Sequence, residues 1–111
     1  MASKASVEWC AGFFEGEGNF RINSAKGKRN YPHLQIAQVH REPLDAFRNC
    51  FDVGIVRGPY GPYNANKQPY YNFCLYGDDA VIVAKQMLPY LFQKKKQIEE
   101  ALLYYEQNPS H

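Results

Sequence analysis

The feature that most constrains the fold is a pair of alternating polar and apolar stretches, which occurs twice along the chain. Residues 19–25 and 31–39 alternate in this way around a polar turn that contains glycine. Residues 55–60 and 70–76 repeat the pattern around a loop rich in Gly, Pro and Asn. Period-two alternation around such a turn is typical of a β-hairpin. We therefore predict two hairpins, each with one apolar face.

A segment with helical spacing of its apolar residues precedes each predicted hairpin. The first covers residues 6–15, with Ser6 as a suitable N-cap and a glycine-rich stop from residue 16 onward. The second begins near Pro43, because a proline lacks an N–H that the first helical turn does not need, and Gly54 breaks it. The chain therefore starts as helix, hairpin, helix, hairpin.

Two more helices are predicted after the second hairpin. Asp78 could cap the first of them, and Pro89 should kink or split it. The last helix covers residues 94–105. This order predicts the α+β class, with an antiparallel four-stranded sheet and all helices packed on its apolar face. We expect residues 1–111 to form one domain.

The composition limits the class of protein. The 111 residues are 45% hydrophobic, so the chain should fold, but a domain this small buries a modest core and would gain from a partner subunit. The three cysteines match neither a zinc spacing nor a disulfide framework. No apolar run could span a membrane and no signal peptide is visible, so we expect a soluble intracellular protein without a membrane partner.

The second face of the predicted sheet is polar. Its side chains combine amides, imidazole and guanidinium groups, which suit base edges and phosphates in a DNA groove. An ordinary solvated sheet face explains the same pattern equally well, and the net charge of +2 gives little support to either. The residues on this face are Arg21, Asn23, His33, Gln35, Arg57 and Asn72.

Small residues dominate one stripe of the first predicted helix, within the segment WCAGFFEGEGNF at residues 9–20. Gly12 and Gly16 are four residues apart and share a face, where a second helix could approach closely. Glycine in a helix costs roughly 1 kcal/mol relative to alanine, so close packing is the expected compensation. Two copies crossing at a two-fold axis would bring two Glu17 carboxylates together, a suitable site for Mg²⁺. The alternative is an amphipathic helix with an acidic, glycine-rich end.

This segment resembles the LAGLIDADG motif of the homing endonucleases. Ala11, Gly12, Glu15, Glu17 and Gly18 occupy the motif's small and acidic positions. Both acids are Glu rather than Asp, and Cys10 replaces the leading leucine. The resemblance extends from about residue 8 to residue 105 and implies an αββαββα core. It further implies a saddle-shaped sheet in the major groove and a dimer interface formed by the motif helices.

The resemblance also implies roles for single residues. Glu17 matches the metal-binding acid, the Gly16 carbonyl a backbone ligand, Gln38 a polar residue near the attacking water, and Lys94 a lysine near the scissile phosphate. Glu15 matches an acid with a more structural role. Alternatives remain: Lys94 as a solvated lysine in a run of three, and Gln38 as a strand-edge hydrogen-bonding residue. The predicted dimer-interface residues are Ala11, Gly12, Glu15 and Gly16, and the predicted DNA-binding residues are Arg21, Asn23, Lys26, Lys28, Tyr31, His33, Gln35, Arg57, Tyr70 and Asn72.

The hypothesis that follows is a site-specific homing endonuclease. It would hydrolyse phosphodiester bonds of double-stranded DNA as a homodimer on a roughly palindromic site, with Mg²⁺ or another divalent cation such as Mn²⁺. No small-molecule substrate is expected. Rival hypotheses are an RNA-splicing maturase or a catalytically inactive DNA-binding module of the same fold, and a structural protein whose sheet binds protein. The resemblance adds mitochondrion and chloroplast as candidate locations.

Overall fold

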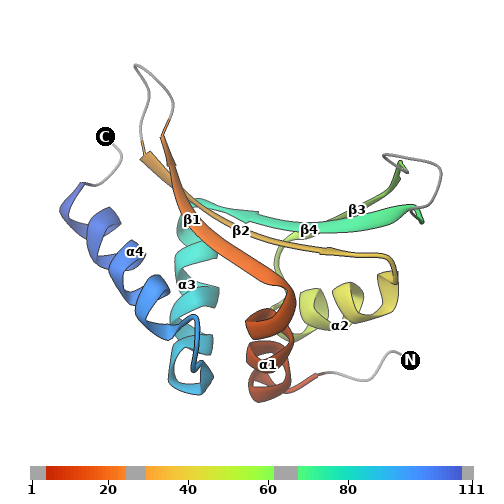
Figure 1. The fold of residues 1–111 in the computed structure, drawn as a ribbon, viewed down its shortest axis with the longest axis horizontal. Coiled ribbons are helices and arrows are strands. Elements are labelled where there is room, and N and C mark those ends of the chain that lie inside the picture. Colours follow the sequence, from red (N-terminus) through yellow and green to blue (C-terminus); the bar gives the residue numbers. More distant parts are fainter. Residues whose placement is uncertain (1–4, 25–29, 62–67, 109–111) are drawn as a thin grey trace.

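The computed structural model describes residues 5–24, 30–61 and 68–108 of the chain. The order helix, hairpin, helix, hairpin, helix is the predicted one, and a short 3₁₀ turn separates the last two α-helices (Figure 1). The elements are α1 (Val7–Glu17), β1 (Gly18–Ser24), β2 (Asn30–Gln38), α2 (Arg41–Phe51), β3 (Ile55–Tyr60), β4 (Tyr70–Tyr76), α3 (Gly77–Met87), η1 (Leu88–Tyr90) and α4 (Lys95–Gln107).

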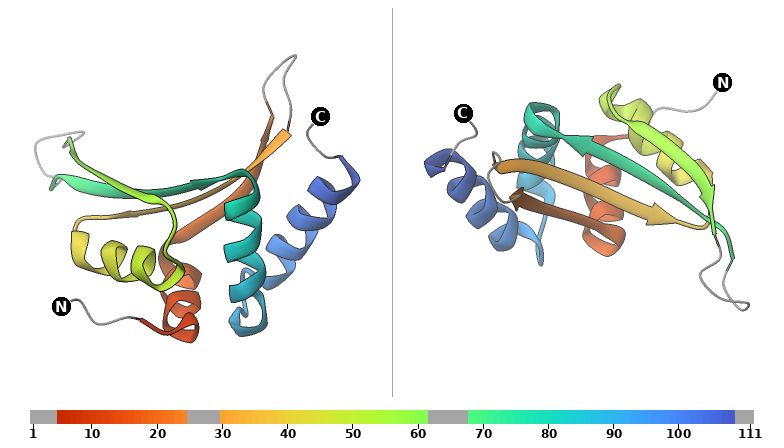
Figure 2. Two further views of the ribbon diagram at one scale, coloured as in Figure 1. Left: turned by 180° about the vertical axis from the view of Figure 1, so that it is seen from behind. Right: turned by 90° about the horizontal axis from the view of Figure 1, so that it is seen from above.

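The four strands form one antiparallel sheet in the order β1-β2-β4-β3. Phe20 lies opposite Leu34, which lies opposite Leu75, so one apolar row crosses three strands on a single face. All helices cover this face, and the other face is open along the curved sheet (Figures 1 and 2). The predicted α+β fold, with a saddle-shaped antiparallel sheet and helices on one face, is confirmed.

Aromatic side chains fill the layer between sheet and helices. Phe14 of α1, Phe20 of β1, Phe47 of α2 and Phe73 of β4 are all almost completely buried. Phe47 packs edge-on against Phe73, with ring centroids 5.1 Å apart. Burial of each such side chain contributes about 1.5–3 kcal/mol, so this cluster fixes α1 and α2 against the sheet.

Helix α1 begins as predicted and ends two residues later than predicted. The Ser6 hydroxyl accepts a hydrogen bond from the backbone N–H of Trp9 at 3.0 Å, the expected N-cap. Gly16 is helical, and the chain leaves the helix at Gly18, whose N–H donates to the Phe14 carbonyl. Because the strand starts at Gly18, Glu17 is the last helical residue and sits at the junction of α1 and β1.

The other helix ends show two further differences from the prediction. Helix α2 stops at Asp52, whose left-handed backbone (φ 55°) ends it before Gly54 is reached. Asp78 does not cap α3, because it is the second residue of that helix and Tyr76 occupies the cap position. Pro89 splits the helical region as predicted, within η1. Among the described helices, none has the length and apolar character required to cross a membrane.

The three cysteines carry free thiols, in agreement with the sequence prediction. Burial raises the pKa of the Cys10 thiol far above its usual range, and the neighbouring Cys50 thiol raises it further. Cys10 is therefore a neutral, small apolar residue of the core between α1 and α2.

Gly18 offers a test of this packing. A Cβ at Gly18 would lie 2.0 Å from Cδ1 of Phe14, whose ring is fully buried in the core. Gly18→Ala should therefore lower the free energy of unfolding by about 1–3 kcal/mol, the usual cost of overpacking. Urea unfolding measures the effect, with Ser24→Ala at the exposed end of the same strand as control. Equal stabilities of the two variants would contradict the packing described.

Candidate functional site

The end of α1 and the end of β2 meet at a shallow hollow on the surface. Glu17, Gln38 and Tyr70 line it together with Ala37 and Val39, and its volume is about 250 Å³. Glu17 is exposed and Gln38 is half-buried. The register explains the meeting, because Gly18 pairs with Ile36, two residues before Gln38. The structure thus brings together two of the three residues that the sequence predicted to be catalytic.

Glu15 turns away from this hollow and holds the chain that precedes α4. Its carboxylate accepts hydrogen bonds from the backbone N–H groups of Phe92 at 2.6 Å, Gln93 at 2.7 Å and Lys94 at 3.0 Å. Burial by itself would raise the pKa of Glu15, but these three bonds and the nearby Lys94 charge outweigh it and hold the pKa below its usual value of 4.5. Glu15 is therefore an anionic clamp between α1 and the start of α4.

Lys94, the third predicted catalytic residue, reaches the same end of α1. Its ammonium group donates a hydrogen bond to the backbone carbonyl of Glu15, two residues before Glu17. The side chain is half-buried, and Lys95 and Lys96, which follow it, are exposed. Lys94 therefore differs from its neighbours and is more than one solvated lysine in a run of three. Its positive charge is held against the last turn of α1 by this bond to the backbone.

Oxygen donors at this helix end fit a divalent cation. The Glu17 carboxylate is a hard ligand, and Gly16 lies in the last turn, where helix carbonyls lack intrahelical partners. Mg²⁺ takes six oxygens, so water, a phosphate or a second chain must supply the rest. Within the described residues, no three His, Cys, Asp or Glu side chains are grouped to hold a metal. The donor set therefore fits the expected cation as part of a larger site.

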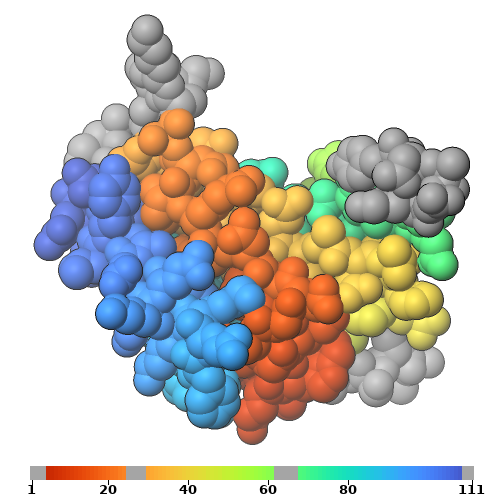
Figure 3. All heavy atoms as spheres, viewed as in Figure 1, coloured from red at the N-terminus to blue at the C-terminus, as the bar shows by residue number. Residues whose placement is uncertain are grey.

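One face of α1 is open and lined by glycine and aromatic residues. Gly12 and Gly16 are exposed, and a Cβ added to either would meet no atom of residues 5–24, 30–61 or 68–108 within 4 Å. Trp9, 43% exposed, stacks on Phe13 at a centroid distance of 5.1 Å along the same face. Figure 3 shows α1 and the segment before α4 forming adjoining parts of one surface. No contact with the described part of the chain requires glycine at these two positions.

Two of the four predicted interface residues make their contacts within their own chain. Ala11 is completely buried in the core of its own chain, so its assignment to the interface is wrong. A helix has one inward stripe, and Cys10, Ala11 and Phe14 form it in α1. The carboxylate of Glu15 is engaged within the chain by the clamp described above.

The predicted DNA-binding residues share the open face of the sheet. Residues directly opposite in an antiparallel pair lie on the same face, and Arg21 is opposite His33, as Arg57 is opposite Asn72. The predicted alternation therefore assigns these residues to the correct face. Lys26 and Lys28 lie outside the described residues. The open-face residues, which we name the outer row, are Arg21, Asn23, Tyr31, His33, Gln35, Arg57, Tyr70 and Asn72.

His33 is less available than the sequence suggested. It is 7% exposed, and its ring stacks on Tyr76 with centroids 4.6 Å apart and planes 4° from parallel. Burial, and then the Arg21 charge, lower the pKa of the imidazole, so the ring is neutral at neutral pH. Its Nε2 is buried without a hydrogen-bond partner among the described residues. Tyr76, missed from the sequence, lies four residues after Asn72 on β4, so the same alternation places it in this row.

Solved structures provide the comparison that identifies the fold. The homing endonuclease I-CvuI, in complex with its target, superposes with a TM-score of 0.72 at 22% identity over 93% of this chain and 67% of that chain. The archaeal intron-encoded homing endonuclease I-Vdi141I, complexed with DNA, gives 0.65 at 21% identity over 90% and 64%. The chain has the LAGLIDADG homing-endonuclease fold. No family model and no curated protein matches the sequence.

A third structure shows how much of a longer protein this fold can occupy. The LAGLIDADG meganuclease I-AabMI, bound to uncleaved DNA, superposes with a TM-score of 0.69 at 23% identity. The match covers 89% of this chain and 35% of that one. The chain spans about two thirds of the length of I-CvuI and I-Vdi141I and about one third of I-AabMI.

The clamp of Glu15 predicts a pH-dependent stability. A carboxylate whose pKa is lowered by folding stabilises the fold fully above its unfolded pKa, near 4.5, and loses this effect as the pH falls through the lowered pKa. Glu15→Gln should lower the free energy of unfolding at pH 7 by roughly 1 kcal/mol, since a charged acceptor becomes neutral. Urea unfolding at pH 7 and pH 3 should show this difference shrinking in acid. A difference independent of pH would contradict the clamp.

Proposed function

We propose that the chain is one subunit of a homodimeric, site-specific DNA endonuclease that uses a divalent metal ion. The observation that carries this proposal is that Glu17 and Gln38 line one hollow at the end of α1, while Lys94 binds the backbone of the last turn of this helix and its glycine face is open. I-CvuI, which shares the fold, was crystallised with its DNA target in the presence of calcium. The outer row of the sheet supplies the matching surface for a duplex.

Each residue at this end of α1 has a proposed role that fits its chemistry. Glu17 and the carbonyl of Gly16 would hold Mg²⁺ or Mn²⁺. When bound, such an ion neutralises charge on the phosphate and lowers the pKa of bound water. Gln38, whose amide both donates and accepts, orients the attacking water by hydrogen bonds. Lys94 places a positive charge beside the phosphate and stabilises the charge that develops on its oxygens.

The exposed glycine face of α1 is the argument for a dimer. Glycine at positions 12 and 16 weakens a helix by roughly 1 kcal/mol each relative to alanine, and no close contact with the described residues compensates for either. A second helix crossing at a two-fold axis explains both, because only a residue without a side chain allows that approach. Such a crossing brings the Glu17 carboxylates of two subunits to the same end of the interface. Two identical subunits then select a roughly palindromic site.

Glu17→Gln tests the metal-binding assignment. The neutral amide keeps the shape of the side chain but binds a hard cation poorly, so Mg²⁺-dependent cleavage of duplex DNA should fall roughly a hundredfold or more. DNA binding, followed by fluorescence anisotropy, should persist. Glu8→Gln makes the same change in the first turn of α1 and should cut normally. Unchanged cutting by Glu17→Gln would overturn the assignment, and binding without cutting by the unmodified protein would favour an inactive DNA-binding module.

Gly12→Leu tests the dimer. The new side chain has open space within its own chain, so the monomer should stay folded and gain up to about 1 kcal/mol from helix propensity. The second helix can no longer approach, and sedimentation should show monomers at concentrations where the unmodified protein forms dimers. Glu100→Leu, at an exposed position of α4, is the matched control and should remain dimeric. A dimeric Gly12→Leu variant would refute this interface.

A further inference from the structure

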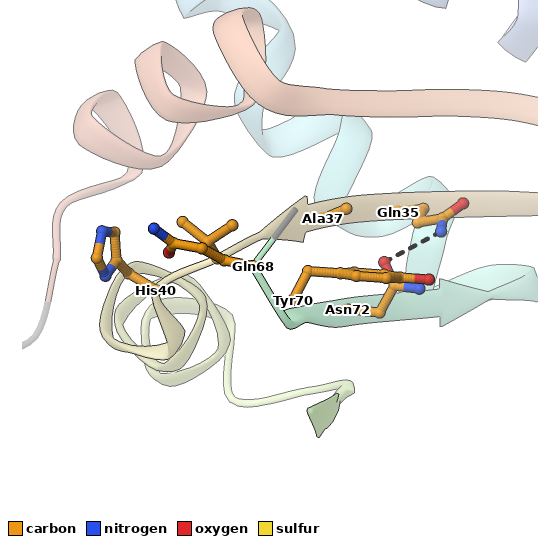
Figure 4. Close-up of a pocket in the computed structure, with 7 residues that line it drawn as sticks. Gln35, Ala37, His40, Gln68, Tyr70 and Asn72 are labelled. Atoms are coloured by element: carbon orange, nitrogen blue, oxygen red, sulfur yellow. Dashed lines mark hydrogen bonds between the residues drawn. The ribbon is translucent and has the colours of Figure 1, made fainter. Parts of the chain in front are cut away.

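A hollow in the open face of the sheet contains an amide pair that links two strands. The hollow has a volume of about 720 Å³, and its lining includes Gln35 and Ala37 of β2 and Tyr70 and Asn72 of β4 (Figure 4). The amide nitrogen of Gln35 donates a hydrogen bond to the amide oxygen of Asn72 at 3.1 Å. Both side chains are half-buried, so the pair is held in place and still faces the hollow.

The strand register makes this pair possible. Asn72 lies directly opposite Ala37, and Gln35 lies opposite Cys74, so the two amides are diagonal neighbours across β2 and β4. Ala37 is too small to fill the space beside them, which leaves the hollow open next to the Gln35 amide. The bond to Asn72 uses one N–H of Gln35. No other described residue bonds to this amide, so a second N–H and the carbonyl oxygen remain for a ligand.

The free edge of Gln35 presents one donor and one acceptor side by side. In the major groove adenine presents N6–H as a donor and N7 as an acceptor, which complements this edge. Guanine presents two acceptors, O6 and N7, and cytosine presents one donor, so neither satisfies both groups of the amide. The exposed methyl group of Ala37, two residues along β2, suits the C5-methyl group of thymine. Both contacts therefore favour an A·T pair.

We propose that the Gln35–Asn72 pair reads adenine in one A·T base pair of each half-site, with Asn72 acting as a positioning residue for Gln35. This inference rests on the proposed function, because it requires a duplex to lie on the outer row. Asn72 fixes the direction of the Gln35 amide before DNA arrives, so less side-chain entropy is lost on binding. A homodimer repeats the same A·T pair at symmetry-related positions of the target.

Selection of bound duplexes from a random library tests the assignment. The unmodified chain should enrich adenine over guanine and cytosine by about fivefold or more at one position of each half-site. Gln35→Glu offers acceptors alone and should move the preference at that position to cytosine, whose N4 amino group donates. Asn72→Ala removes the support of Gln35 and should reduce the adenine preference severalfold. Gln86→Glu makes the same amide-to-acid change on α3, away from the sheet, and should leave the selected sequence unaltered.

The outcomes separate the two proposals. If the Gln35 and Asn72 variants stay folded by circular dichroism and bind DNA, yet no position of the selected site changes, the readout is refuted and the DNA-binding function stands. A change at a position where the unmodified protein selects guanine or cytosine refutes adenine as the base. If the unmodified chain selects no duplex at all, the proposed function fails and the readout fails with it.

Discussion

The contact between Phe14 and Gly18 sets the position at which α1 becomes β1. The ring of Phe14 lies where a Cβ of residue 18 would be, so helix and strand are joined without an intervening loop. Glu17 is consequently held at the junction between two rigid elements. A carboxylate in a loop would move relative to Gln38, whereas this one has its backbone fixed by the core beneath it. The geometry of the candidate site is thus a consequence of core packing.

The side chains of residues 9–18 lie in several different environments. Its inward stripe packs into the core, Gly12 and Gly16 leave a flat outer face, Glu15 binds the backbone before α4, and Glu17 faces the hollow with Gln38. A helix can do this because 3.6 residues per turn distribute successive side chains around its axis. For the same reason the two acids, only two residues apart, lie on different sides of the helix. Glu15 is the internal clamp, and Glu17 is available to a ligand.

Sequence patterns predicted the sheet correctly because alternation leaves two choices of face and the apolar residues decide between them. Phe20 and Leu34 fixed the inner face, and the outer row followed. Helix ends were predicted less well. The run from Gly16 to Gly18 predicts the end of the first helix, and the chain leaves the helix at the last of these residues, where the Phe14 ring occupies the space of a Cβ. The side chain of Asp78 suits an N-cap, but Tyr76 holds that position because β4 runs directly into α3.

Side-chain partners could not be predicted in the same way, because they depend on segments far apart in the sequence. Glu15 meets the backbone of Phe92 across 77 positions, and Gln35 meets Asn72 across 37. In the proposed complex the amide pair matters because the net charge of the chain is only +2, which gives little non-specific attraction to phosphates. More of the proposed affinity for a duplex must then come from hydrogen bonds to base edges. In that proposal, the bond between Gln35 and Asn72 sets the direction of the Gln35 amide before binding, so less side-chain entropy is lost and no charge is added.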